Sequence, residues 1–209
     1  MDESLRLKRL TQAVTKANVL RKKQKQKIDI LCKDFINSQV DFIEQLNSIS
    51  FAAEFYKSII GHRDTNKLLY TAARLLCRQA DNLKIVFVLN TPDSFEIHAA
   101  ASNAYSDDAD SFEQYFNTQL VQNICSSNSI CTLDVLYELG LECSPMLSKK
   151  IDAVTLPLGT PGASLGFILA YSYEKNRLTP ALLDKITLIT TGLSKAIQTC
   201  TQTAGLYHS

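Results

Sequence analysis

The stretch that decides the fold is residues 151–197, which reads IDAVTLPLGTPGASLGFILAYSYEKNRLTPALLDKITLITTGLSKAI. Residues 153–158 and 164–173 are apolar runs of strand length, and the Gly-Thr-Pro-Gly sequence at 159–162 is typical of a tight turn between them. Pro180 stands where a helix opened by Thr179 would begin. These signals predict a strand hairpin followed by a long helix. The apolar stripe of that helix is Leu182, Ile186, Ile189, Leu193 and Ala196.

An earlier hairpin is predicted at residues 84–101. Residues 84–89 contain the buried-strand sequence Ile-Val-Phe-Val-Leu, and residues 95–101 alternate apolar side chains with Glu96 and His98. The sequence Asn-Thr-Pro-Asp-Ser between them has the composition of a turn. Before this hairpin, Asp64 as an N-cap and the apolar positions that follow it predict a helix.

The segment between the two hairpins is predicted to hold a helix and a short strand. The capping residues at 106–111 introduce a helix that runs to about Cys125, and a strand is expected at 130–133, ending at Asp134. The elements thus follow in the order helix, hairpin, helix, short strand, hairpin, helix. We predict an α+β fold in which helices flank an antiparallel sheet.

This order resembles the GAF domain, a sensory module related to the PAS fold. The resemblance covers about residues 51–200. Its clearest matches are Ser-Ile-Cys-Thr-Leu-Asp at 129–134, Val-Thr-Leu-Pro-Leu at 154–158 and Gly-Phe-Ile-Leu at 166–169. We therefore expect a GAF-like domain at 51–205, preceded by a long helical, coiled-coil-like extension at 1–50.

The chain departs from the liganded subfamilies of this family. The Asn-Lys-x-Phe-Asp-Glu signature of cyclic-nucleotide-binding GAF domains has no counterpart, and no His directly follows Cys125, Cys131 or Cys143, as in bilin attachment of the phytochrome type. The gaps between these cysteines are also shorter than the pattern of free methionine-(R)-sulfoxide reductase, an enzyme of the family. The resemblance therefore implies a small-molecule ligand without naming it, and the cofactor is unknown.

In the GAF fold the ligand lies between the sheet and its covering segment, which here is residues 101–145. Aromatic side chains could stack on a flat ligand, while hydroxyl, thiol and imidazole groups supply polar contacts. The alternative is that the aromatic residues are core packing and that His98 faces solvent. No nucleophile, base and orienting acid form a recognisable motif, so no catalytic residue is assigned. The candidate ligand-binding residues are His98, Tyr105, Phe112, Tyr115, Phe116, Cys125 and Thr155.

The first sixty residues contain neither Gly nor Pro, so nothing in them stops a helix. Apolar residues recur there at heptad spacing, which is typical of a coiled coil, although Arg21 and Gln24 interrupt the seam. Capping residues at 47–50 predict a break and a second helical piece at 50–60. The alternative is a helix that folds back on its own domain. The candidate dimer-interface residues are Leu7, Leu10, Val14, Ala17, Ile28, Leu31, Phe35 and Phe42.

The composition limits the classes of function. A net charge of +1 over 209 residues argues against a dedicated nucleic-acid binder, and the basic run 21–27 is interpreted as a solvated helix face, with acidic lipid or nucleic acid as the alternative. Six cysteines without a Cys-x-x-Cys pair predict no metal site. Because no long apolar run and no secretory signal are present, we expect a cytoplasmic protein without membrane insertion.

The leading hypothesis is a signal-transduction module of bacterial type. It would be a homodimer through its N-terminal and C-terminal helices, and an unidentified small molecule would change the helix geometry that a separate signalling protein or an output domain reads. Parallel coiled coils beside a sensor domain can pass small rotations along a dimer axis. Two alternatives stay open: a thiol enzyme of the sulfoxide-reductase type working through Cys125, Cys131 or Cys143, and a ligand-free interaction domain whose pocket is filled by side chains.

Overall fold

The structure is a computed structural model that describes residues 3–91, 94–99, 111–160, 162–173 and 178–206, so the candidate residue Tyr105 lies outside the described residues. The chain separates into two compact units, Met1–Ile49 and Ser50–Ser209. Helix α1 (Glu3–Ile59) supplies the first unit and, from Ser50 on, the first element of the second.

In the first unit, α1 presents its apolar side chains to solvent. Between Leu7 and Ile49, its large hydrophobic side chains are 49–70% exposed. The break predicted at 47–50 is wrong, because helical structure continues through these residues. The Ser48 hydroxyl donates to the Glu44 carbonyl at 2.9 Å and so bonds within the helix instead of capping a new one. No helix in the described part of the chain is both long and apolar enough to cross a bilayer.

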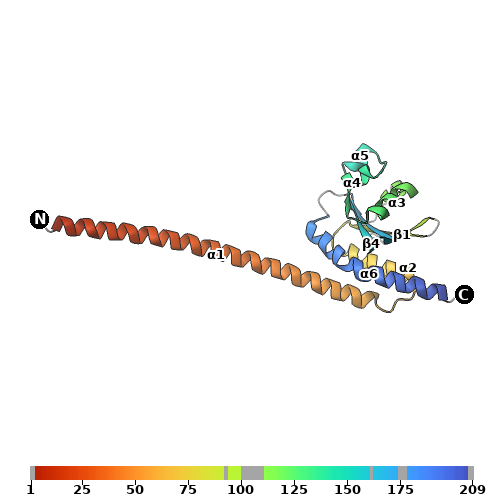
Figure 1. Cartoon of the computed structure of the whole chain (residues 1–209), viewed down its shortest axis with the longest axis horizontal. Helices are drawn as coiled ribbons and strands as arrows, with labels where there is room; N and C mark the ends of the chain where they lie inside the picture. The colour runs from red at the N-terminus through yellow and green to blue at the C-terminus, as the bar shows by residue number, and fades with distance from the viewer. Residues whose placement is uncertain (1–2, 92–93, 100–110, 161, 174–177, 207–209) are drawn as a thin grey trace. The chain divides into compact units, whose positions relative to one another are not determined.

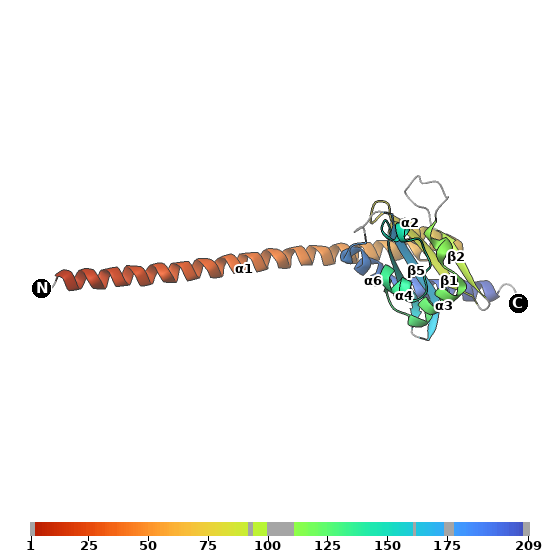
Figure 2. The same ribbon diagram turned by 90° about the horizontal axis from the view of Figure 1, so that it is seen from above.

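The second unit is built on a five-stranded antiparallel sheet with the order β2-β1-β5-β4-β3. Figure 2 shows β2, β1 and β5 side by side. Both predicted hairpins are present, as β1–β2 and β4–β5. The strands are β1 (Lys84–Asn90), β2 (Phe95–Ala99), β3 (Cys131–Thr132), β4 (Asp152–Thr160) and β5 (Ala163–Ser172).

Local signals explain where the main helices begin. Asp64 Oδ1 accepts from the Asn66 amide at 2.8 Å and caps α2, and Thr179 Oγ1 accepts from the Leu182 amide at 3.3 Å at the start of α6. Both starts were predicted from the sequence. The helices after α1 are α2 (Thr65–Cys77), the 3₁₀ turn η2 (Phe112–Tyr115), α3 (Thr118–Ser127), α4 (Leu133–Glu138), α5 (Pro145–Ser148) and α6 (Pro180–Leu206).

Two predicted elements of the covering segment are corrected. The helix expected to run to Cys125 is two pieces, η2 and α3, because Asn117 caps a new helix by accepting from the Leu120 amide at 2.8 Å. The strand expected at 130–133 is only Cys131–Thr132, and the following residues form α4. At Asn117 a cap that is one polar residue among several decides the boundary, whereas Thr132 precedes α4 without a capping bond from its side chain.

The sheet has two buried faces. The helix face, which includes Phe87, Leu156 and Ile168, packs against α2, α6 and the end of α1, whereas the cover face, which includes Val88, Phe167 and Leu169, packs against η2, α3 and α4. Figure 1 shows α2 and α6 on one side of the sheet and α3, α4 and α5 on the other. Successive residues of each strand contribute to opposite cores, because side chains alternate along a strand.

Candidate functional site

The centre of the cover face is packed with aromatic side chains. The Phe116 ring centroid lies 6.0 Å from that of Phe167, and the Phe112 centroid lies 5.6 Å from that of Tyr171. Phe112 and Phe116 are 0% and 3% exposed, whereas Tyr115 is half-buried at the margin. The two phenylalanines proposed to stack on a ligand therefore serve as core here, and they occupy the middle of the expected pocket.

A polar group lies at the edge of this packed centre. The Tyr171 hydroxyl donates to Glu113 Oε2 at 2.7 Å, and burial together with this carboxylate raises the pKa of Tyr171. Lys84 Nζ lies 5.9 Å from the Tyr171 ring centroid and 5.3 Å from that of Tyr173. Sequence reasoning did not single out these residues, although strict alternation along the strand predicted at 164–173 places Phe167, Leu169 and Tyr171 on one face.

Thr155 supplies a buried polar atom on the cover face. It is 0% exposed and sits on β4 between Cys131 of β3 and Leu169 of β5, both of which belong to the cover-face core. Its hydroxyl oxygen has no hydrogen-bond partner among the described residues. An unpaired buried hydroxyl costs stability, so Thr155 remains a candidate polar contact for a ligand.

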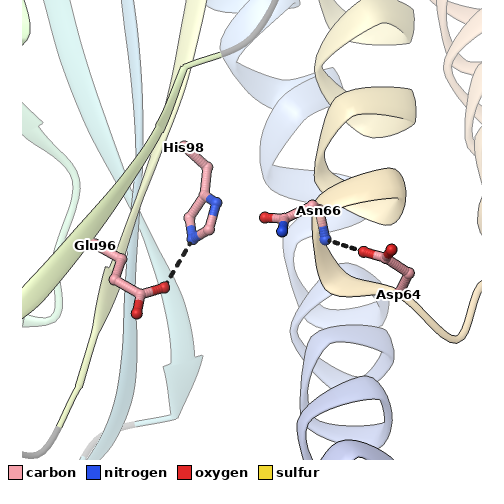
Figure 3. Close-up of polar contacts among 4 residues, drawn as sticks. All are labelled: Asp64, Asn66, Glu96 and His98. Atoms are coloured by element: carbon pink, nitrogen blue, oxygen red, sulfur yellow. Dashed lines mark hydrogen bonds and ion pairs between the residues drawn. The ribbon is translucent and has the colours of Figure 1, made fainter.

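His98 lies on the helix face of the sheet. Its assignment to the ligand site on the cover face was therefore wrong. It is paired with Phe87, and Glu96 is paired with Leu89, so both polar side chains share the helix face. Figure 3 shows His98 directed from β2 toward α2, near Asn66, with its Nε2 3.3 Å from Glu96 Oε2. The register between β1 and β2 decides this placement, since a shift of one residue would exchange the faces.

A groove runs along α3 at the rim of the cover face, and we call it the α3 groove. It consists of two cavities of about 460 Å³ and 400 Å³ that share Asn90 and Gln122. The ends of both hairpins and one side of α3 form its walls. Of the candidate residues that the structure describes, Cys125 alone lines it. The other lining residues are Thr91, Ser94, Phe95, Thr118 and Val121 in the first cavity, and Ser126, Gly162, Ala163 and Ser164 in the second.

Three cysteines lie in the covering segment, and each contacts a hydroxyl group. Burial raises the pKa of Cys125, and a hydrogen bond with the Ser164 side chain offsets part of that rise. Cys131 is fully buried, with its Sγ 3.6 Å from the Ser127 hydroxyl. Cys143 Sγ lies 2.7 Å from the Tyr137 hydroxyl, and burial together with this contact raises the pKa of Tyr137. A raised thiol pKa disfavours the nucleophilic thiolate at Cys125.

No protein-family model and no curated protein matches the sequence. Solved structures do match the fold. The GAF domain of an Acinetobacter phosphoenolpyruvate-protein phosphotransferase superimposes with a TM-score of 0.56 at 10% identity, over 76% of this chain and 97% of that one. The chain has the GAF fold.

Two further structures extend this likeness. The chromophore-binding domain of a bacteriophytochrome from R. palustris has a TM-score of 0.57 at 11% identity, over 77% of this chain and 63% of that one. Free methionine-R-sulfoxide reductase from Neisseria meningitidis, in complex with its substrate, has a TM-score of 0.54 at 14% identity, over 75% and 91%. At such identities the likeness concerns the GAF fold and leaves ligand and activity open.

Within this GAF fold, the hairpin that borders the α3 groove is tied to α6. The Gly159 amide donates to Ser194 Oγ at 2.9 Å, and Ser194 Oγ donates to the Thr190 carbonyl at 2.7 Å. Ser194 is 6% exposed, so water competes little for these bonds. The β4–β5 hairpin, whose Ala163 and Ser164 line the groove, is therefore hydrogen-bonded to the last helix through Gly159.

A second contact joins α6 to the end of α1 within the same unit. The Tyr56 hydroxyl donates to the Leu188 carbonyl at 3.3 Å, and the Tyr56 ring lies over Gly192, where a Cβ atom would collide with it. A side chain at position 192 would have to displace the Tyr56 ring. A displacement of α6 would therefore change the contact between this helix and Tyr56.

Proposed function

We propose that the chain is a dimeric GAF-fold regulatory module that binds a small, neutral, polar molecule in the α3 groove and passes the bound state to α6 and to a separate signalling partner. The observation that carries this proposal is the pair of adjoining cavities with Asn90 and Gln122 in common. A ligand that fills both cavities would bridge the ends of the two hairpins, which are far apart in the sequence.

The lining of the groove defines the class of ligand. The polar side chains among the described residues that line it are amides, hydroxyls and one thiol, and none of these described residues is Asp, Glu, Lys or Arg. Burial of a charged ligand group against this part of the surface would be costly because these residues offer no counter-charge. Each cavity falls within the range of about 300–1,000 Å³ that is common for small-molecule sites. A sugar, polyol, nucleoside or amide fits these properties.

The route from groove to helix follows the hydrogen bonds of the β4–β5 hairpin. A ligand that contacts Ser164 contacts β5 close to the turn of the hairpin. On the other strand, β4, the Gly159 amide donates a hydrogen bond to Ser194 of α6. A change in this hairpin would bias the position of α6 relative to Tyr56. Such coupling requires only that ligand binding differ between two arrangements of the hairpin.

The dimer is proposed from the surface of α1 together with the C-terminal helix. A helix whose large apolar side chains are 49–70% exposed needs a partner to bury them. We expect the full chain to be a dimer at tens of micromolar in light scattering and sedimentation. A full chain that is monomeric at this concentration would remove the dimeric part of the proposal and leave the ligand part standing.

The ligand site is tested with two exposed glutamines of α3. Gln122 lines both cavities, whereas Gln119 lies outside them and donates to Asn123 Oδ1 at 3.1 Å. In saturation-transfer NMR of the full chain against a panel of sugars, polyols, nucleosides and small amides, Gln122→Trp should abolish binding by filling the groove. Gln119→Trp, the matched control, should keep it. Binding that survives Gln122→Trp, or its absence in the wild-type chain across the panel, contradicts the proposal.

The thiol-enzyme alternative has one observation in its favour, which is that Cys125 lines the groove. Its raised pKa works against thiolate chemistry. Turnover of free methionine sulfoxide with a thiol reductant decides the matter, with a variant in which Cys125, Cys131 and Cys143 are all replaced by Ser as the control. Activity in the wild-type chain above this control would replace the regulatory proposal with an enzymatic one.

A further inference from the structure

The first unit carries its charge in two halves of equal length. Residues 6–27 contain nine Lys or Arg and no Asp or Glu, which gives a net charge of +9. Residues 28–49 contain one Lys against four Asp or Glu, a net charge of −3. Both halves share the seam of exposed apolar side chains described above. A second copy of this helix therefore meets a very different surface in each of the two possible orientations.

A parallel pair would bring like charges together. In that arrangement each seam residue faces the same residue of the other copy. The two +9 halves then lie side by side, and Arg21 meets the partner's Arg21 in the seam. Like charges would repel along about 30 Å of helix. The layers would also be uneven, because Ala17 faces a second Ala17 while Phe42 faces a second Phe42.

We infer that residues 10–49 of α1 pair in antiparallel orientation with the same helix of a second copy, the basic half of each against the acidic half of the other. The inference rests on the dimer proposed above and adds its orientation. In the register whose centre lies between Ile28 and Leu31, Ile28 of each helix faces Leu31 of the other helix, so this contact occurs twice. Lys27 then flanks Asp34 of the partner subunit, so charges of opposite sign are neighbours.

The same register evens out the seam. Phe42 faces Ala17 and Ile49 faces Leu10, so a large side chain meets a smaller or equal one in these two layers, while Phe35 faces the polar Gln24. Arg21 faces Ser38, which removes the like-charge contact of the parallel pair. The heptad interruption at Arg21 thus becomes compatible with a paired helix.

A second copy accounts for more of this surface than an anionic polymer does. A nucleic acid or an anionic lipid surface would neutralise the basic half. It would leave the seam side chains of residues 28–49, including Phe35 at 64% and Phe42 at 57% exposure, in water next to four carboxylates. An antiparallel copy covers the seam side chains of both halves and places the acidic half of each helix beside the basic half of the other.

Distances between spin labels measure the orientation directly. The background is a full chain in which the three cysteines that are not buried, Cys32, Cys125 and Cys143, are replaced by Ser. Gln12→Cys is introduced into this chain and labelled with a nitroxide. Circular dichroism checks that the labelled chain keeps its helicity. The antiparallel pair predicts a label separation of about 50 Å, and a parallel pair predicts about 10–20 Å. The matched control Lys33→Cys, near the centre, gives a short distance in either case.

A short distance at Gln12 overturns the orientation but leaves the dimer in place. An absence of dipolar coupling at both positions overturns the orientation and the proposed dimer together. The two failures are therefore distinguishable, and neither depends on a ligand.

Charge reversal gives an independent measurement. Replacement of Asp34, Asp41 and Glu44 by Lys turns attraction into repulsion in the antiparallel pair and should raise the dimer dissociation constant by about tenfold or more at low salt. The control variant replaces the exposed Asp134, Glu138 and Glu142 of the second unit by Lys, which changes net charge equally. Equal effects of the two variants contradict the antiparallel arrangement.

Discussion

The two faces of the single sheet differ in what they bury. The helix-face core is almost wholly aliphatic and aromatic, and long helices cover it. The cover face, built by the alternate residues of the same strands, adds the Tyr171–Glu113 hydrogen bond and the unpaired hydroxyl of Thr155, both under short helices. One face therefore supplies stability to the GAF fold, and the other carries polar groups that a ligand or a movement could use.

The largest effect is expected where both faces depend on one backbone contact. Gly166 of β5 has a φ of +133°, and a Cβ atom there would collide with the Val88 carbonyl of β1. Gly166→Ala should lower the free energy of unfolding by about 3–5 kcal/mol, as measured by urea denaturation. Gly162→Ala, where φ is +82° but nothing lies within 4 Å, should cost only about 1 kcal/mol. Equal losses of unfolding free energy in the two variants would show that the positive φ alone, and not the contact with Val88, makes Gly166 necessary.

The helix face is expected to respond to alkaline pH through Cys77. Burial raises the pKa of this thiol from 9.0 to about 11. A raised folded-state pKa means that the contribution to stability is complete below pH 9 and is lost as the pH rises toward 11. The loss is about 2–3 kcal/mol at most. Thermal melts between pH 8 and 11 should show this slope, and Cys77→Ala should flatten it. An unchanged slope in the variant would assign it to other groups.

The cover face is expected to respond to removal of one hydroxyl. Tyr171→Phe deletes the donor to Glu113 and should cost about 1–2 kcal/mol, because the bond is to a carboxylate. Tyr115→Phe is the matched control on the neighbouring half-buried tyrosine and should change stability by less than about 0.5 kcal/mol. If the two variants are equally stable in urea, the Tyr171–Glu113 bond contributes no net stability.

The smallest effect has the opposite sign. Thr155→Val removes a buried hydroxyl without a described partner and should stabilise the free protein by about 0.5–1 kcal/mol. Thr132→Val, on the exposed neighbouring residue, should be close to neutral. A destabilised Thr155→Val variant would mean that the hydroxyl has a partner. Should a ligand use this hydroxyl, the same variant would bind it more weakly while being more stable.

Sequence reasoning succeeded where the signal is local. The two hairpins, the Asp64 cap and the start of the last helix at Pro180 each depend on a few adjacent residues, and all are present. It failed where several caps compete, as at Asn117, which divides η2 from α3, and at Ser48, which bonds within α1. The placement of His98 was wrong because alternation groups residues on one face but does not say which core that face meets.

The sequence by itself determined the order of the main elements and the apolar seam of α1, because periodicity and turn chemistry act over a few residues, and the resemblance to the GAF domain supplied the topology. Only the tertiary structure decided that Phe112 and Phe116 fill the expected pocket and that Asn90, Gln122 and Ser164 border one groove. These residues meet through strand register and helix packing, which are set by contacts between distant segments. The chemistry of the candidate site is therefore a product of packing, whereas its scaffold can be read along the chain.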